Sequence, residues 1–171
     1  EQLHGLNASG RSPQTLTAEK LAGQSAMPSK GWPTVTVPGC VSAWMTLSER
    51  FGKLPFADLF EPTVAYAQEG FIVSPITGRG WARAAKTFQD FPAFVAGFLP
   101  NGRAPEIGTR FAFPDQAKTL RKIAETKGEA FYHGDLAEQI VAHAQETGGY
   151  FTKQDFANHQ ADWVDTISID Y

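Results

Sequence analysis

The chain has 171 residues, a formal net charge of −3 and a single cysteine. Its 13 Phe, 4 Trp and 4 Tyr supply large apolar side chains for a core. A chain of this length buries roughly 70% of its unfolded surface in one core, so a single ordered domain is expected. The near-neutral charge argues against a strongly basic nucleic-acid binder, and no apolar run is long enough to predict a membrane-spanning helix. The lone Cys40 excludes an intrachain disulfide and a cysteine-based metal cluster.

Both ends of the chain are expected to lie within a longer protein. Glu1–His4 has neither an initiator Met nor the basic and apolar parts of a signal peptide. Residues 161–171 alternate apolar and polar side chains, which predicts a strand still running at the chain end. Its partner is expected outside the chain, the alternative being an edge strand that closes a small domain.

The first 38 residues are predicted to be rich in loops. Gly, Ser and Pro punctuate this stretch, with a short helical segment from Leu16 to Gly23. The β-branched run Thr34–Val37 predicts a short strand that ends at a tight turn formed by Pro38 and Gly39.

Residues 39–160 are predicted to form a helical lobe, in which Phe71–Val73 is an extended connector. Apolar spacing and end signals predict a helix from Val41 to Phe51 ended by a left-handed Gly52, and a helical run from Pro55 through Asp58 that Pro62 either kinks or follows with a second segment up to Gly70. Further helices are predicted from Ser74-Pro75 to about Phe88, after an Asp115 cap to Gly128, and after Asp135 to Gly148. A Thr152–Asp155 capping box predicts one more helical turn. Residues 88–114 are predicted to be a loop with aromatic anchors. The expected fold class is α+β and mostly helical.

Few residues stand out for chemistry. The four histidines occupy unlike contexts, which disfavours a metal site. Cys40 is placed at a helix amino end, where a thiolate is stabilised, although a small buried residue is the more common reason for a cysteine there. Arg79, Arg83 and Lys86 form a basic stripe that is interpreted as a solvated helix face.

The loop Asn7–Pro13 is the best candidate for a binding site. It combines small polar donors, a flexible glycine and Arg11 with little apolar content. A planar guanidinium suits bidentate capture of a carboxylate, and neighbouring amide and hydroxyl groups can complete such a site. A plain connecting loop with an exposed arginine is the alternative.

Six segments in chain order resemble the gamma-glutamyltranspeptidase family. They are Asn7–Pro13, Val35–Trp44, Phe51–Pro55, Pro62–Val73, Phe131–Gly134 and Gly148–Phe156. Each motif is weak alone, but their shared order identifies the chain as a C-terminal portion of that family's large subunit.

The resemblance implies an N-terminal-nucleophile hydrolase with the larger αββα fold. Such proteins are made as one precursor that cuts itself to free a threonine, whose own amine activates its hydroxyl for attack on the donor amide. That threonine begins the small subunit and lies beyond Tyr171, so the resemblance implies no catalytic residue, cofactor or metal in this chain. The isolated chain is then expected to be inactive, with the small subunit and a carboxylate-bearing small molecule as its partners.

The resemblance also assigns Arg11 to the carboxylate of the substrate, with Ser9 and Asn7 as further candidates. In the transpeptidases the arginine stands four residues before the proline, whereas here Ser9 holds that place and Arg11 precedes Pro13 by two. This departure favours the branch similar to cephalosporin acylases, which accept glutaryl-type side chains. A free-standing helical module that docks a partner through Phe91–Phe113 is the alternative function, and the cellular compartment is left open.

Overall fold

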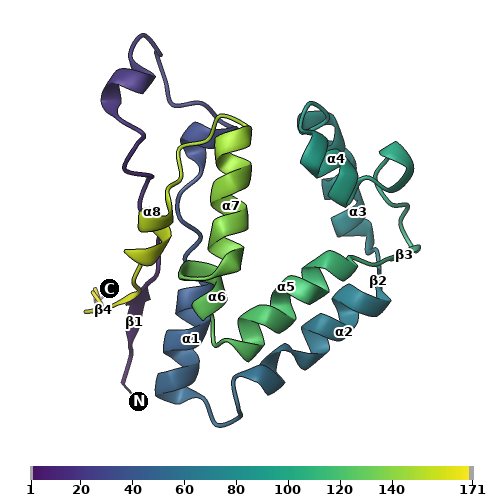
Figure 1. Ribbon diagram of the computed structural model, residues 1–171. Helices are drawn as coiled ribbons and strands as arrows, with labels where there is room; N and C mark the ends of the chain where they lie inside the picture. The colour runs from purple at the N-terminus through teal and green to yellow at the C-terminus, as the bar shows by residue number, and fades with distance from the viewer. Residues whose placement is uncertain (1, 170–171) are drawn as a thin grey trace. The chain divides into compact units, whose positions relative to one another are not determined.

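The computed structural model describes residues 2–169 of the chain. These residues divide into two compact units, one running up to Asp58 and resuming at Lys122, the other spanning Leu59–Arg121. Helices dominate both units and the strands are short, which confirms the mostly helical α+β prediction (Figure 1).

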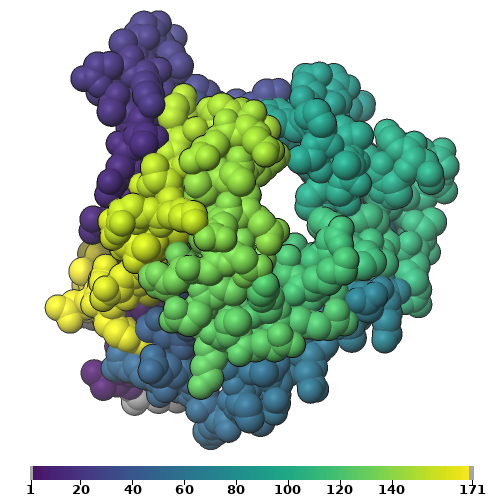
Figure 2. All heavy atoms as spheres, in the orientation of Figure 1, coloured from purple at the N-terminus to yellow at the C-terminus, as the bar shows by residue number. Residues whose placement is uncertain are grey.

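The first unit holds the last part of the chain against its beginning. Its elements are β1 (Gly5–Asn7), α1 (Cys40–Phe51), α6 (Glu129–Tyr132), α7 (Asp135–Glu146), α8 (Lys153–Ala157) and β4 (Asp162–Val164), with 3-10 turns at Ala18–Leu21 and Trp32–Thr34. Helices α6, α7 and α8 pack on one another. In the space-filling view the end of the chain, in yellow, lies beside the N-terminal segment, in purple (Figure 2).

The core of this unit is lined by apolar side chains from these helices, from Ile123 and from the segments before α1 and α8. The buried ones include Val37, Val41, Ile123, Ala130, Tyr132, Leu136, Val141, Ala144, Phe151 and Phe156. Leu136, Val141 and Ala144 share one face of α7 at helical spacing, as the sequence predicts.

The second unit contains the remaining helices and one short β-pair. Its elements are α2 (Glu61–Glu69), β2 (Phe71–Ile72), α3 (Pro75–Thr87), α4 (Pro92–Phe98) and β3 (Arg110–Phe111), with a 3-10 turn at Pro100–Gly102. Two further elements each have residues in both units: a 3-10 turn at Ala57–Phe60 and α5 (Pro114–Glu125). The Ser74 hydroxyl accepts a hydrogen bond from the Thr77 amide, which confirms the predicted cap of α3.

The strand predicted at the chain end is shorter than expected and is paired inside the chain. Only β4 forms, antiparallel to β1, with Leu6 opposite Trp163. Residues 165–169 are not strand, and 170 and 171 lie outside the described residues. The expectation that the partner lies elsewhere is therefore wrong for this edge, because the partner sits in an N-terminal stretch whose three paired residues carry no strand pattern.

The strand predicted at Thr34–Val37 does not form. Trp32–Thr34 is a 3-10 turn, and the extended residues after it make a single backbone hydrogen bond to the N-terminal loop, from Val37 N to Arg11 O at 3.1 Å. Pro38 has no N–H with which to continue a ladder. The β-branched run is extended, as its side chains favour, but it lacks the pairing that makes a strand.

Three helix-end predictions are also wrong. Gly52 has φ −64°, so it ends α1 without a left-handed residue; a Cβ there would lie 2.3 Å from Ser48 O, which explains the glycine by close approach. Asp115 lies inside the first turn of α5 and Asp135 is the first residue of α7, so neither precedes its helix as a cap. Both aspartates still place a negative charge at the helix amino end.

The aromatic loop predicted for residues 88–114 contains a helix. Pro92 opens α4, because its fixed φ suits the first helical position, so this proline starts a helix and does not interrupt a loop. The aromatic anchors are present: Phe94 stacks on Phe98 at 5.2 Å, and Phe98 meets Phe113 edge-on at 5.1 Å. These rings contact one another within the unit.

Candidate functional site

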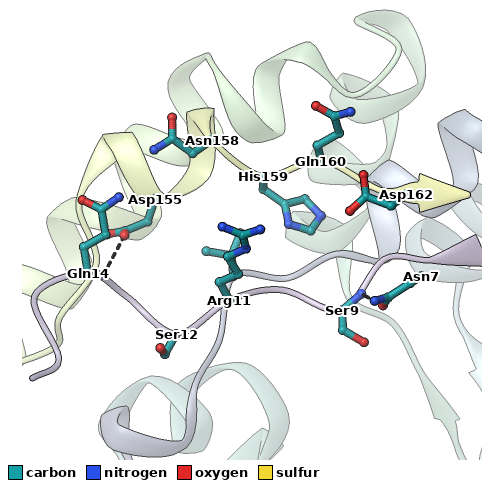
Figure 3. A pocket seen from close by; sticks show the side chains of 11 residues that line it. Asn7, Ser9, Arg11, Ser12, Gln14, Asp155, Asn158, His159, Gln160 and Asp162 are labelled. Atoms are coloured by element: carbon teal, nitrogen blue, oxygen red, sulfur yellow. Dashed lines mark hydrogen bonds between the residues drawn. The ribbon is translucent and has the colours of Figure 1, made fainter. Parts of the chain in front are cut away.

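A polar pocket of about 490 Å³ lies in the first unit, where the loop after β1 meets the end of α8 (Figure 3). Its lining comes from three separate stretches of sequence: Asn7, Ser9, Arg11, Ser12 and Gln14; Val37; and Asp155, Asn158, His159, Gln160 and Asp162. The three residues that the sequence singled out, Asn7, Ser9 and Arg11, are thus brought into one pocket.

Arg11 extends into this pocket with an exposed side chain (Figure 3). Within residues 2–169 its guanidinium makes no ion pair and no hydrogen bond. Nearby, Asn7 Oδ1 accepts a hydrogen bond from the Ser9 amide at 3.0 Å, which folds the loop on itself. The pocket therefore contains a fixed positive charge whose five N–H donors are available to a ligand.

The backbone of the Arg11 loop is held by very close approach to the segment before α1. A Cβ on Gly10 would lie 1.7 Å from Val37 O, and one on Gly39 would lie 1.6 Å from Ala8 O. Only glycine permits such contact at these two positions. The loop that carries Arg11 is therefore seated on Val37–Gly39 at two points.

Asp155 ties the same loop to α8. Its carboxylate is buried, 7% exposed; Oδ1 accepts from the Gln14 amide at 2.8 Å, and Oδ2 accepts from the amide and the hydroxyl of Thr152, each at 2.7 Å. The predicted capping box is confirmed. Its second task, holding the chain three residues after Arg11, was missed because nothing local in the sequence links Gln14 to Asp155.

Replacing Asp155 with asparagine is expected to destabilise the protein by about 2 kcal/mol, because an amide offers one acceptor oxygen where the carboxylate offers two, and a buried donor then faces an NH2 group. Urea unfolding of the protein that carries this chain measures the change. Asp115→Asn is the matched control: Asp115 is exposed in the first turn of α5 and pairs with Lys118 in solvent at 2.8 Å, so its loss should cost less than about 1 kcal/mol. Equal midpoints for the parent and Asp155→Asn would contradict this role.

His159 lines the pocket opposite Arg11 and was not singled out by the sequence (Figure 3). Its Nε2 lies 2.8 Å from Ser42 Oγ, and its ring stacks on Tyr132 with the ring centres 5.1 Å apart. Burial lowers the pKa of His159 below its ordinary value, opposed by the nearby Asp162 carboxylate. The one feature of the sequence that could have singled out His159 is its position just after a capped helix.

The other chemical candidates lie away from this pocket. Cys40 begins α1 and is exposed, so the interpretation as a small buried residue is wrong. Arg79, Arg83 and Lys86 are exposed along α3, which confirms a solvated face. Across residues 2–169, no group of three or more His, Cys, Asp or Glu side chains is arranged to hold a metal ion, and no helix has the length and apolar character needed to cross a bilayer.

Comparison with known proteins gives consistent matches along the whole chain. The family model described as Gamma-glutamyltranspeptidase matches residues 1–171. The chain is 39% identical to a glutathione hydrolase-like YwrD proenzyme of Bacillus subtilis, over 96% of this chain and 32% of that protein. It is 36% identical to a glutathione hydrolase proenzyme of Pseudomonas aeruginosa, over 79% of this chain and 24% of that protein.

Solved structures agree with these matches. The crystal structure of a cephalosporin acylase from Bacillus halodurans superposes with a TM-score of 0.92 at 42% identity, covering 99% of this chain and 33% of that chain. The chain thus spans about a third or less of the relatives it matches.

Proposed function

Because the chain belongs to the gamma-glutamyltranspeptidase family, we propose that the full-length protein cleaves or transfers amides of carboxylate-bearing acyl groups, gamma-glutamyl or glutaryl in type. The nucleophile in this proposal is an N-terminal threonine outside the chain, freed when a precursor cuts itself into two subunits. The chain contributes the large-subunit wall that binds the acid end of the substrate, and alone it is inactive.

The unpaired Arg11 guanidinium carries this proposal. It projects into a pocket whose other lining side chains are four amides, two hydroxyls, one imidazole, one valine and the carboxylates of Asp155 and Asp162. A carboxylate placed against it gains a charge-assisted, bidentate hydrogen bond, and Asn7, Ser9 and Ser12 line the same pocket. The close approaches of Gly10 and Gly39 and the hydrogen bond from the Gln14 amide to Asp155 hold the Arg11 loop in place, which supports a preformed site for the carboxylate.

Arg11→Ala in the full-length protein is expected to lower kcat/KM for gamma-glutamyl and glutaryl anilides by about 30-fold, the loss of roughly 2 kcal/mol that follows when a charge-assisted pair is removed. Arg11→Lys should restore part of the rate, since a lysine supplies the charge without the bidentate fork. Steady-state kinetics on both anilides provides the measurement.

Arg79→Ala is the control for this variant, because Arg79 is exposed on α3 and lines no part of the pocket. Unchanged kinetics in Arg11→Ala would remove Arg11 from the substrate site. Mass analysis of the purified protein tests the other half of the proposal: two subunits are expected, the smaller one beginning with threonine, and a single uncut chain with full activity would exclude self-cleavage.

A further inference from the structure

The imidazole of His159 is fixed in place by a network around the start of α1. Its ring stacks on the Tyr132 ring at an interplanar angle of 26°. Tyr132 is itself held, since its hydroxyl donates to Pro38 O at 2.8 Å and accepts from the Ser42 amide at 3.0 Å. The ring is therefore presented to the pocket with little freedom to turn.

The same network determines which ring nitrogen carries the proton. The Ser42 hydroxyl has one hydrogen, which it donates to Gly39 O at 2.8 Å. In its hydrogen bond with His159 Nε2, Ser42 must then be the acceptor, so Nε2 carries the hydrogen. In the neutral ring Nδ1 is left as an acceptor, and within residues 2–169 nothing donates to it.

Burial keeps the His159 ring neutral, so that Nδ1 remains an acceptor, although one neighbouring carboxylate acts in the opposite direction. That carboxylate is Asp162, the first residue of β4, which favours the protonated ring. Arg11 lines the facing wall of the pocket, and the buried Asp155 carboxylate already accepts from three donors. Tyr132, whose pKa burial raises, remains a neutral phenol beneath the ring. Because the pKa of His159 is itself lowered, the ring is neutral at neutral pH and Nδ1 accepts.

We propose that His159 is a specificity-determining residue of this pocket, where its Nδ1 accepts a hydrogen bond from an N–H or O–H group that a ligand carries beside the carboxylate bound by Arg11. The pocket then favours an acid head with a donor on the carbon next to the carboxylate over a plain dicarboxylic head. The inference rests on the proposed function, since it takes Arg11 as the partner of the carboxylate.

Two substitutions separate the two ring nitrogens. In His159→Gln the side-chain amide reaches the place of Nε2 and can still donate to Ser42, but nothing accepts where Nδ1 was. In His159→Asn the amide oxygen takes the place of Nδ1. Kinetics of the full-length protein on gamma-glutamyl anilide, which has a donor next to its carboxylate, and glutaryl anilide, which has none, gives the specificity ratio.

His159→Gln is expected to lower the ratio of kcat/KM values, glutamyl over glutaryl, about tenfold, while His159→Asn stays within about threefold of the parent. His133→Gln, at an exposed histidine outside the pocket, should leave the ratio unchanged. Equal losses on both anilides in His159→Gln, or no loss on either, would overturn the proposal. Arg11→Ala distinguishes this failure from that of the proposed function, because it should lower both rates whatever His159 does.

The pH dependence of the parent protein gives a second, mutation-free measurement. Protonation makes Nδ1 a donor, so the ratio should fall as the pH drops through the pKa of His159, which burial lowers from its ordinary value. His159→Gln should flatten this fall. A parent ratio that is constant from neutral to mildly acidic pH would contradict the role of Nδ1, even if neither His159 variant can be purified folded.

Discussion

Replacing Gly10 with alanine is expected to lower the free energy of unfolding by about 3 kcal/mol, at the upper end of the effects of overpacking. The added methyl would lie 1.7 Å from Val37 O, and both partners are backbone, so no side chain can turn aside to make room. The Arg11 loop must separate from Val37, which also breaks the hydrogen bond from Val37 N to Arg11 O. Urea unfolding measures the loss of stability.

The same variant is expected to lose activity on carboxylate-bearing donors at least as severely as Arg11→Ala, because a displacement of about 1 Å at a positioned group costs on the order of 100-fold in rate. Gly80→Ala is the matched control. A Cβ on Gly80, inside α3, meets nothing within 4 Å, so alanine there should stabilise the helix by about 0.5 to 1 kcal/mol. A Gly10→Ala protein with parental stability and kinetics would show that the loop is not seated as described.

The features predicted correctly from the sequence are those set by neighbouring residues. The Thr152–Asp155 capping box and the Ser74 cap depend on side chains three residues apart, and both form as expected. The apolar face of α7 likewise follows from its own spacing. Local patterns of this kind predict the start, the end and the buried face of single helices, but not how the elements pair or pack with one another.

Helix ends such as Gly52 were local errors, but the strands predicted wrongly depend on residues far apart in the chain. The β1–β4 pair places Leu6 opposite Trp163, and no pattern in the sequence of either three-residue strand predicts that it pairs with the other. The Thr34–Val37 stretch has the composition of a strand, but its neighbour is a loop that offers one hydrogen bond. Strand formation needs a partner, which composition cannot supply.

The candidate site shows the same division. Asn7, Ser9 and Arg11 are adjacent in the sequence, so one loop motif could nominate all three, and the pocket does contain them. Asp155 and His159 reach the pocket from the other end of the chain through α8. Their part in it follows from contacts with Gln14 and Ser42, which only the folded chain brings near.

Phe156→Ala is expected to destabilise the protein by about 3 to 5 kcal/mol, since it removes a large side chain that is 0% exposed and leaves a cavity in the core. The Phe156 ring meets Phe151 edge-on at 5.1 Å and Phe131 at 6.4 Å, so it anchors α8 to the rest of the unit. Chemical denaturation gives the change in stability.

The substitution should disturb the pocket as well, because residues on either side of Phe156 line one wall of the pocket. These are Asp155 before Phe156, and Asn158, His159 and Gln160 after it. Activity of the folded fraction is therefore expected to fall together with stability. Phe51→Ala is the matched control, since Phe51 ends α1 with 49% of its surface exposed and should cost less than half as much. Similar losses for the two variants would mean that α8 does not depend on Phe156 for its position, and the pocket wall would then need another anchor.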